Sequence, residues 1–448
     1  MTALDPALDL FPLAASVLAA ITCGVLGNFL LLRRESLMGD AISHGVLPGL
    51  VIGFLITGDR NPVVMLIGAT AAGITTVLLV MLVRRIGRVE SGAAMGVVFS
   101  VLFALGVLLI ERAARQTDID ADCVLHGQLE TLAWYDAPAM WRDVPAWTTI
   151  QSMPRQVWLL AIACILACGF VITFFKELRL AAFDPALASA LGLRPRIIDL
   201  ATMVLVAIAT VASFEAVGSI LVIAMLICPA ATARLLTDRL SRQVGLSVVV
   251  AIATSVLGYR AATIVPSWFG DESVNAAGSM ALTAGLILVA TILAAPTHGV
   301  ISKHLRARRV SRRIAIDDLL TTLLRTEESR SPDALPISPG NLGRLPSSAA
   351  IANARRAGLV DGAHAEDLHL TEDGRQAARM VLRRHRLWET YLVEEAGFSP
   401  DHVHDPAEVL EHLAPTPSML STRDPHGRVI PDPSEPAGDR SPEDPESG

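Results

Sequence analysis

The sequence predicts an all-α polytopic membrane protein with eight or nine spans, followed by a smaller cytoplasmic α+β domain. Of the 448 residues, 52% are hydrophobic and 18% are charged, and the mean hydropathy is +0.48. This composition is too apolar for an ordinary soluble protein. The polar residues are also concentrated after residue 300. We therefore expect a membrane domain at 1–302, a cytoplasmic domain at 303–430 and a disordered tail at 431–448, which is rich in Pro, Asp, Glu and Ser.

The predicted spans are apolar segments long enough to cross about 30 Å of hydrocarbon. Six of them lie near 11–32, 62–83, 92–110, 156–175, 244–265 and 278–300. Three more segments, near 41–57, 199–214 and 216–233, are shorter or carry polar residues. One of these three could be re-entrant, which is why eight and nine spans both stay open.

Basic residues predict which side of the membrane each loop occupies, because Lys and Arg are retained in the cytoplasm. Most of them lie in one set of alternate loops, which includes Arg33, Arg84, Arg179, Arg239 and Lys303. We therefore expect the amino terminus outside and the polar carboxyl-terminal region in the cytoplasm. The chain has no GxxxxGK[ST] phosphate loop, so it is not expected to hydrolyse ATP by that mechanism.

A candidate site lies in the sequence GDAISHGVLPG at 39–49. Asp40 and His44 are four residues apart and share one face of a helix. Acidic and imidazole side chains within a span generally face a polar interior, a partner or a permeating ion. Glu215, between two of the short segments, is a third candidate.

Two carboxylates and an imidazole suit a divalent first-row metal such as manganese, zinc or iron. In the alternative interpretation Asp40 caps the second segment, and His44 and Glu215 make structural hydrogen bonds.

The loop FDPALASALGL at 183–193 predicts a short amphipathic helix. Asp184 is typical of a helix N-cap, Pro185 of the first helical position and Gly192 of the left-handed terminating position. Such a helix between two spans can act as a lever, although an ordinary surface helix would have the same pattern.

Three stretches together resemble the integral membrane permeases of manganese, zinc and iron ABC importers over about residues 10–300. They are RRESLMGDAISHGVLPG at 33–49, FDPALASALGL at 183–193 and VGSILVIAMLICPAATARLLTDRL at 217–240. The resemblance implies a permease subunit of the bacterial cytoplasmic membrane, rather than an enzyme. It also implies a second permease protomer, an extracytoplasmic metal-binding protein and a separate ATPase subunit that supplies ATP hydrolysis.

The resemblance also assigns roles to residues. It places Asp40 and His44 on the translocation pathway, where Glu215 joins them. It identifies the loop helix as the coupling helix that fits a groove on the ATPase, with contacts from Asp184, Pro185, Ala188, Leu191, Gly192 and Leu193. The metal is then the substrate, and no organic cofactor is expected.

The cytoplasmic region has the element order of a winged helix. A basic stretch at 303–313 begins it, and a passage near 329–347 that is rich in Pro, Ser and Gly is typical of a long loop. Helical patterning returns at 348–358 and at 373–396. Short apolar runs flank a polar turn between Gly358 and Thr371, as in a small hairpin.

Potential metal ligands follow in this region. His385 and Glu389 share one face of the long helix. A further helix, which Asp405 would cap, places three more side chains on one face, namely Glu408, Glu411 and His412. Nitrogen and oxygen donors gathered in this way are typical of a transition-metal site. A solvated charged face is the alternative.

Four stretches of this region resemble the iron- and manganese-dependent repressor family over about 312–430. They are LTEDGR at 370–375, RRHRL at 383–387, VHDPAEVLEH at 403–412 and TRDPHG at 422–427. The resemblance implies an activating metal site formed by His385, Glu408, Glu411 and His412. It implies an ancillary site formed by His404 and Glu389. Of the acid pair expected on the first helix, Asp318 or Asp317 fills one position, and Thr321 stands at the other.

The segment that would be the recognition helix, 345–356, is rich in Ala and has only Arg355 and Arg356 as basic residues. Phosphate neutralisation dominates DNA affinity, so this composition disfavours operator binding. We therefore expect a metal sensor, with Mn²⁺, Fe²⁺ or Zn²⁺ as its regulatory ligand, that restrains transport when cytoplasmic metal is abundant.

Three other functions remain open at this stage. A permease for a siderophore or corrinoid would not need Asp40 and His44 as metal ligands. A membrane-tethered metal-dependent transcription regulator would use the spans only as an anchor. A secondary transporter would need no coupling helix. Among the metals we expect manganese first, then iron or zinc, although the ligand types do not rank them.

Overall fold

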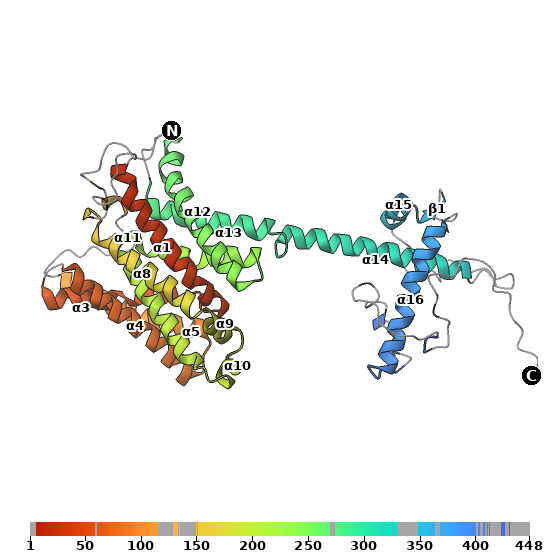
Figure 1. The fold of residues 1–448 in the computed structure, drawn as a ribbon, viewed down its shortest axis with the longest axis horizontal. Helices are drawn as coiled ribbons and strands as arrows, with labels where there is room; N and C mark the ends of the chain where they lie inside the picture. Colours follow the sequence, from red (N-terminus) through yellow and green to blue (C-terminus); the bar gives the residue numbers. More distant parts are fainter. Residues whose placement is uncertain are drawn as a thin grey trace, which may run out of the picture. The chain divides into compact units, whose positions relative to one another are not determined.

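The chain folds as two compact units in the computed structural model, Met1–Lys303 and His304–Gly448 (Figure 1). The structure describes residues 6–58, 61–114, 129–132, 134, 149, 151–268, 274–328, 348–362, 368–399, 402–403, 406–407, 410, 412, 423–425 and 430. Two of the predicted segments, the long loop near 329–347 and the tail at 431–448, lie outside these ranges.

The described part of the first unit is helical. Its elements are α1 (Pro6–Leu32), α2 (Met38–Gly45), α3 (Leu47–Thr57), α4 (Pro62–Gly87), α5 (Ser91–Ala114), η1 (Leu129–Thr131), α8 (Arg155–Thr173), α9 (Phe175–Phe183), α10 (Pro185–Ala190), α11 (Pro195–Leu236), α12 (Leu240–Ser267) and α13 (Ala276–Ala294). Among the described residues, eight helical stretches are long and apolar enough to cross a membrane. This confirms the polytopic all-α class. One stretch, Met38–Thr57, comprises α2 and α3.

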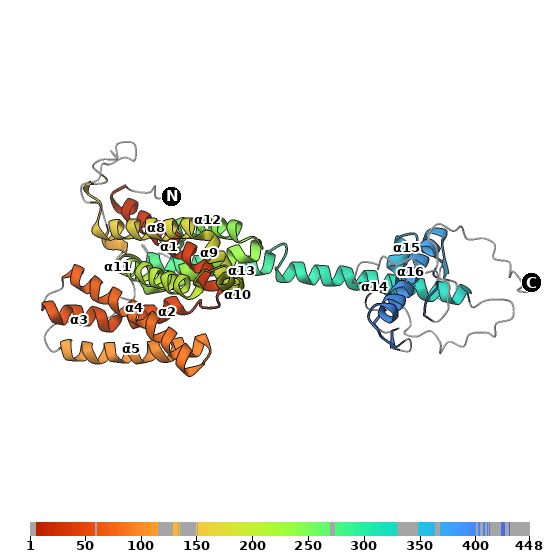
Figure 2. The same cartoon turned by 60° about the horizontal axis from the view of Figure 1, so that its bottom comes forward.

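Most of α1 is buried, because α8, α11 and α12 all pack against it. Helices α3, α4 and α5 pack on one another as a second group (Figures 1 and 2). Inside the first group, Asn28 of α1 donates to Ser247 Oγ of α12 at 2.7 Å and accepts from Gln243 Nε2 at 2.9 Å. All three side chains are buried. Hydrocarbon offers no competing partner, so these bonds fix α1 against α12.

Helix α11 turns back on itself at Gly218, where the backbone has φ 76° and ψ 165°. Asp199, near its start, pairs with Arg33, whereas Leu226, beyond Gly218, lies against Gly27. Gly27 and Arg33 are separated by about 9 Å along α1, but a straight helix would place Asp199 and Leu226 about 40 Å apart. Glycine takes this conformation without steric cost. The two short segments near 199–214 and 216–233 are therefore the two arms of α11.

Two ion pairs lie where α1 ends. Arg33 Nη2 is 2.6 Å from Asp199 Oδ1 of α11, and Glu35 pairs with Arg84 of α4. Burial lowers the pKa of the Arg33 guanidinium, while the Asp199 and Glu35 carboxylates oppose that shift. Arg33 and Glu35 are the buried members of the two pairs, with side chains 9% and 8% exposed. Removing Asp199 or Arg84 would leave a buried charge without compensation, so the pairs hold the ends of α1, α4 and α11 together.

The second unit contains the predicted helix, helix, wing and long helix. Helix α14 (Val300–Glu328) enters this unit, followed by α15 (Ser348–Arg356), β1 (Val360–Asp361), β2 (His369–Leu370) and α16 (Glu372–Glu394). The two strands pair antiparallel. Buried apolar side chains of α14, α15, the strands and α16 form one core, which includes Leu320, Ala354, Val360, Leu370 and Leu382.

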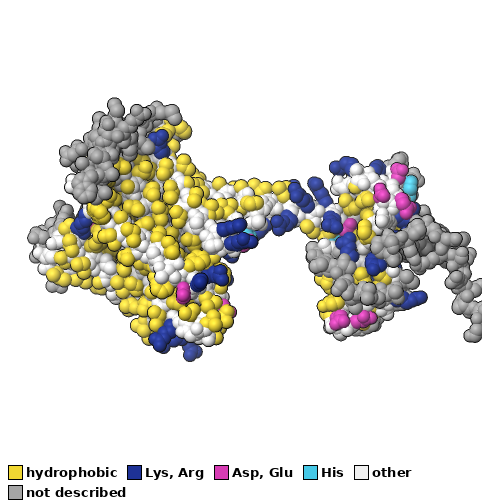
Figure 3. Space-filling view, viewed as in Figure 1, with side chains coloured by type: hydrophobic (Ala, Val, Ile, Leu, Met, Phe, Trp, Pro, Cys, Tyr) yellow, Lys and Arg dark blue, Asp and Glu magenta, His cyan; other side chains and the backbone are white. Residues whose placement is uncertain are grey.

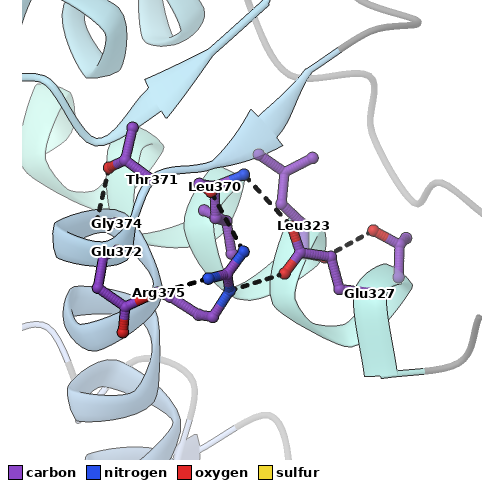
Figure 4. Close-up of polar contacts among 8 residues, drawn as sticks. Leu323, Glu327, Leu370, Thr371, Glu372, Gly374 and Arg375 are labelled. Carbon is purple, nitrogen blue, oxygen red and sulfur yellow. Dashed lines mark hydrogen bonds and ion pairs between the residues drawn. The ribbon is translucent and has the colours of Figure 1, made fainter. Parts of the chain in front are cut away.

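One arginine ties the wing to both long helices (Figure 4). Arg375 of α16 lies 3.2 Å from Glu327 Oε2 of α14 and 3.0 Å from Glu372 Oε2, and its Nη2 donates to the Leu370 carbonyl. Thr371 caps α16 by accepting from the Gly374 N–H at 3.1 Å. These contacts join the end of the predicted wing, at Leu370 and Thr371, to α14 and α16.

Replacing Gly27 with Ala should destabilise the membrane unit, because the added Cβ would overlap the Leu226 carbonyl. Overpacking of this kind typically costs about 1–3 kcal/mol. We expect a lower thermal unfolding midpoint for G27A in detergent. The matched control is G169A on α8, where an added Cβ meets no atom within 4 Å. Equal midpoints for the two variants would contradict the close approach of α1 and α11.

Candidate functional site

Asp40 and His44 form a polar pair within a candidate span. Both lie on α2, with His44 Nε2 3.5 Å from Asp40 Oδ1. The Asp40 side chain is 35% exposed and the His44 side chain 33%. The His44 ring packs against Phe99 and Phe103 of α5, at centroid distances of 5.6 and 5.4 Å. One carboxylate and one imidazole therefore converge beside α5 and stay accessible.

The opposite face of α2 is used for packing. Gly39 lies against Leu226 of α11, and Ile42 is buried beside Gly73 of α4. The N-cap of α2 is Leu37, and no side chain caps the helix. Asp40 therefore does not have the capping role that the alternative interpretation gave it.

Glu215 lies in other surroundings. Its Oε1 accepts a hydrogen bond from Gln156 Nε2 at 3.3 Å, and its Oε2 is 3.8 Å from Arg155 Nη2. Both partners belong to the first turn of α8. Among the described residues, no three His, Cys, Asp or Glu side chains are grouped so as to hold a metal ion. The structure thus brings Asp40 and His44 together and leaves Glu215 with α8.

The predicted loop helix is present as α10. Asp184 Oδ1 accepts from the Leu187 N–H at 2.9 Å, and Pro185 is the first helical residue. Gly192 has φ 83°. The Leu193 N–H donates to the Ala188 carbonyl and the Gly192 N–H to the Ser189 carbonyl, at 3.0 and 3.1 Å. These two bonds are the Schellman closure that a left-handed glycine permits.

The exposed surface of α10 is mostly apolar. Leu187 is 47% and Leu191 66% exposed, whereas Ala188 is fully buried against the unit. Two exposed leucines on a capped two-turn element form a rigid apolar projection that is suited to contact with another protein.

In the second unit, His385 and Glu389 form a buried pair one turn apart on α16. His385 Nε2 is 3.2 Å from Glu389 Oε1, and the two side chains are 5% and 1% exposed. His404, Glu408 and Glu411 lie outside the described residues. The structure therefore places one member of the predicted activating site, His385, against one member of the predicted ancillary site, Glu389.

His412 faces the two adjacent acids of α14. Its Nδ1 is 3.4 Å from Asp317 Oδ2 and its Nε2 is 3.3 Å from Asp318 Oδ1. The sequence left open which of these acids would belong to the metal site, and in the structure both contact His412. The hydroxyl of Thr321, which stands where a second acid was expected, donates instead to the Asp317 and Asp318 carbonyls. These are donor types that a first-row metal accepts, but the two acids lie against opposite ring nitrogens, so the three side chains do not form one group that could hold an ion here.

The two arginines at the end of α15 are engaged within the unit. Arg355 donates to the Gly362 carbonyl, and Arg356 donates to Asn353 Oδ1 at 2.7 Å and to the Ala352 carbonyl at 3.3 Å. Each arginine that holds a local contact is less available to a phosphate. This agrees with the weakly basic composition of the helix.

Three partners of candidate or nearby residues were missed by sequence reasoning. Arg155 and Gln156 were not linked to Glu215, although a basic residue at the start of a span is a weak signal for such pairing. The third is Asp424, which the sequence showed only as part of the motif TRDPHG. Its side chain is fully buried, with Oδ2 3.8 Å from Arg386 Nε.

Comparison with known proteins places both units in families. The profile of the ABC 3 transport family matches residues 10–140 and 149–295. The profile of the iron dependent repressor, metal binding and dimerisation domain, matches residues 371–419. The first match covers more than half of the chain, and the second includes α16 and His412.

Individual relatives agree with these matches. The manganese transport system membrane protein MntD of Bacillus subtilis is 38% identical over 294 residues, which are 66% of this chain and 94% of the relative. The zinc transport system membrane protein TroD of Treponema pallidum is 38% identical over 65% of this chain and 76% of its own length. The B. subtilis protein MntC, also named for manganese transport, is 28% identical over 90% of this chain and 89% of the relative, so its match reaches into the second unit.

Among solved structures, PsaBC from Streptococcus pneumoniae in complex with Fab matches with a TM-score of 0.51 and 28% identity. The match covers 64% of this chain and 92% of that chain. The profile, the relatives and the fold agree: the chain is an integral membrane protein that belongs to the ABC 3 transport family and carries an iron-dependent-repressor domain after its permease region.

Proposed function

We propose that this chain is the permease subunit of an ABC importer that moves a divalent transition metal ion across the bacterial cytoplasmic membrane. The observation that carries the proposal is the Asp40–His44 pair, because a carboxylate and an imidazole within a span are costly unless they serve an ion or each other. Manganese is the first candidate, followed by iron or zinc. Relatives named for manganese and for zinc support this class of substrate.

In this proposal Asp40 and His44 replace part of the hydration shell of the ion. The ionised carboxylate supplies oxygen and the neutral imidazole supplies nitrogen. Two donors fill only part of the shell of a divalent ion, so water or further ligands complete it. A partial shell suits transport, because the ion must bind well enough to enter and weakly enough to leave.

Glu215 becomes a third ligand only when its contacts with α8 are released. Gln156 and Arg155 hold its two oxygens in the present arrangement, and Gly218 lies three residues further along α11. Movement of the α11 arms about Gly218 would free the carboxylate. In this proposal the ligand set therefore changes during the transport cycle.

The partners follow from the same proposal. A separate ATPase subunit supplies ATP hydrolysis and receives α10 in a groove, with contacts from Asp184, Pro185, Leu191, Gly192 and Leu193. Ala188, which the sequence also suggested, is buried against the unit and supports α10 from beneath. An extracytoplasmic metal-binding protein delivers the ion, and a second permease protomer completes the pathway. The amino terminus lies outside and the carboxyl-terminal region in the cytoplasm, with domain boundaries at 302 and 430.

We infer that the second unit is a metal sensor that restrains transport when cytoplasmic metal is abundant. His412 and the acids Asp317 and Asp318 supply its described donors. These acids lie on α14, which begins six residues after the last span ends. A tethered transcription regulator is disfavoured because Arg355 and Arg356 hold contacts within the chain. A siderophore or corrinoid permease is disfavoured because it would not need the Asp40–His44 pair on α2.

Replacing Asp40 or His44 with Ala should abolish metal uptake while assembly with the ATPase persists, because each change removes a ligand and leaves the contacts of Gly39 and Ile42 with α11 and α4 in place. The measurement is uptake of radioactive manganese by reconstituted importer, with complex formation followed by size-exclusion chromatography. S100A on α5, whose hydroxyl bonds only within its own helix, serves as the control. Wild-type uptake by both D40A and H44A would refute the role of the pair.

Replacing Asp184 with Ala should weaken coupling. Loss of the bond to the Leu187 N–H removes the N-cap of α10, which typically costs about 1 kcal/mol. We expect reduced stimulation of ATP hydrolysis by the loaded binding protein, with metal binding by the permease unchanged. The control is N275A, which removes an equivalent cap from α13. If the two variants lose stimulation equally, α10 has no special role in coupling.

Replacing Asp318 with Ala in the full chain should relieve restraint by internal metal, because it removes a carboxylate from His412. Proteoliposomes loaded with increasing manganese should slow uptake by the wild type and slow it less in D318A. D361A, an exposed change in the wing, is the matched control. The sensor role is wrong if the wild type shows no slowing, or if D318A slows as the wild type does.

A further inference from the structure

The first half of α14 carries an unusual concentration of positive charge. Residues 300–316 contain no Asp or Glu, although the whole chain has a net charge of −7. Within them lie six basic side chains in eleven positions: Lys303, Arg306, Arg308, Arg309, Arg312 and Arg313. Figure 3 shows dark blue side chains along this helix. Four of them, at 303, 306, 309 and 313, follow at spacings of three and four and so share one face.

The described part of the chain does not neutralise this charge. All six side chains are exposed, and none takes part in an ion pair with a described acid. Some arginines elsewhere are paired, as Arg33 is with Asp199 and Arg375 with Glu327. Like charges three and four residues apart repel one another. An isolated helix gains nothing from such a stripe, so the charge points to an anionic partner outside the chain.

Local contacts hold the start of α14 at the end of the last span. The Ala295 carbonyl, one residue after α13, accepts from the Gly299 N–H at 3.0 Å and from Ser302 Oγ at 2.7 Å. In the same turn, His298 Nε2 lies 3.0 Å from Asp238 Oδ1, between α11 and α12. The basic stretch therefore begins directly at the membrane unit.

The same turns of α14 also expose apolar side chains. Val300, Ile301 and Leu305 are 55%, 53% and 49% exposed, and the last two are four residues apart. Basic and apolar side chains exposed together next to a span are typical of contact with an anionic lipid surface. A nucleic acid would not require the apolar residues, and a soluble acidic protein would not require the basic stretch to begin at the span.

We propose that residues 300–313 of α14 bind anionic phospholipid headgroups at the surface of the membrane in which α13 ends. The guanidinium and ammonium groups contact the headgroup phosphates, and Val300, Ile301 and Leu305 enter the interface. The stretch spans about 20 Å, enough for several headgroups. The contact would restrain α14, which further on carries Asp317 and Asp318. It does not depend on which substrate the permease carries.

The test compares amide hydrogen exchange of residues 300–313 in the full chain between nanodiscs of phosphatidylcholine and nanodiscs that also contain phosphatidylglycerol. We expect several-fold slower exchange in the anionic discs, with the difference lost at high salt because exposed charges are then screened. The variant K303Q/R306Q/R309Q/R313Q should lose the difference. The variant R239Q/R242Q, which neutralises exposed arginines near the start of α12, should keep it.

Equal exchange in the two kinds of disc would overturn the proposal. It would also be overturned if protection appears only on addition of the ATPase subunit or of duplex DNA, because the partner would then be a protein or a nucleic acid. Exchange at 319–324, in the buried part of α14, reports whether the quadruple variant is folded. If it is not, the comparison of wild-type protein in the two lipids decides alone.

Discussion

A polar side chain within a membrane needs a partner, because hydrocarbon supplies none, and this constraint organises the permease unit. Asn28, Gln243 and Ser247 satisfy one another between α1 and α12, and Arg33 and Asp199 pair where α1 and α11 meet. These contacts join different helices. The Asp40–His44 pair differs, because both of its members lie on one helix. The contact between them therefore does not tie one helix of the permease unit to another.

The break at Gly218 divides α11 into two arms that different neighbours hold. One arm of α11 is fixed at Asp199 and the other packs against α1 through Leu226, while Glu215 beside the break is held by α8. Helix α10 leads directly into α11, which carries Glu215. A displacement of α10 would therefore be passed to Glu215 along α11 alone. In the proposed cycle, the chain thus connects the expected ATPase contact to the pathway without a separate transmission element.

Features with local signals could be predicted from the sequence, and features that depend on distant contacts could not. The α10 helix was predictable because Asp184, Pro185 and Gly192 each act within the loop itself. The wing followed from apolar runs around a polar turn, and the spans from their length. The partners of Glu215 were not predictable, since Arg155 lies 60 residues away in sequence. The reversal at Gly218 was not predictable either, because a glycine in an apolar run fits a straight span equally well.

The account depends most on whether the pair on α2 binds the ion. Pulsed electron paramagnetic resonance of manganese bound to the full chain detects histidine nitrogens coordinated to the metal. The account predicts that H44Q loses one such nitrogen signal and that H298Q, a histidine held by Asp238, keeps it. Identical spectra for the wild type and H44Q, with manganese still bound, would contradict the central claim.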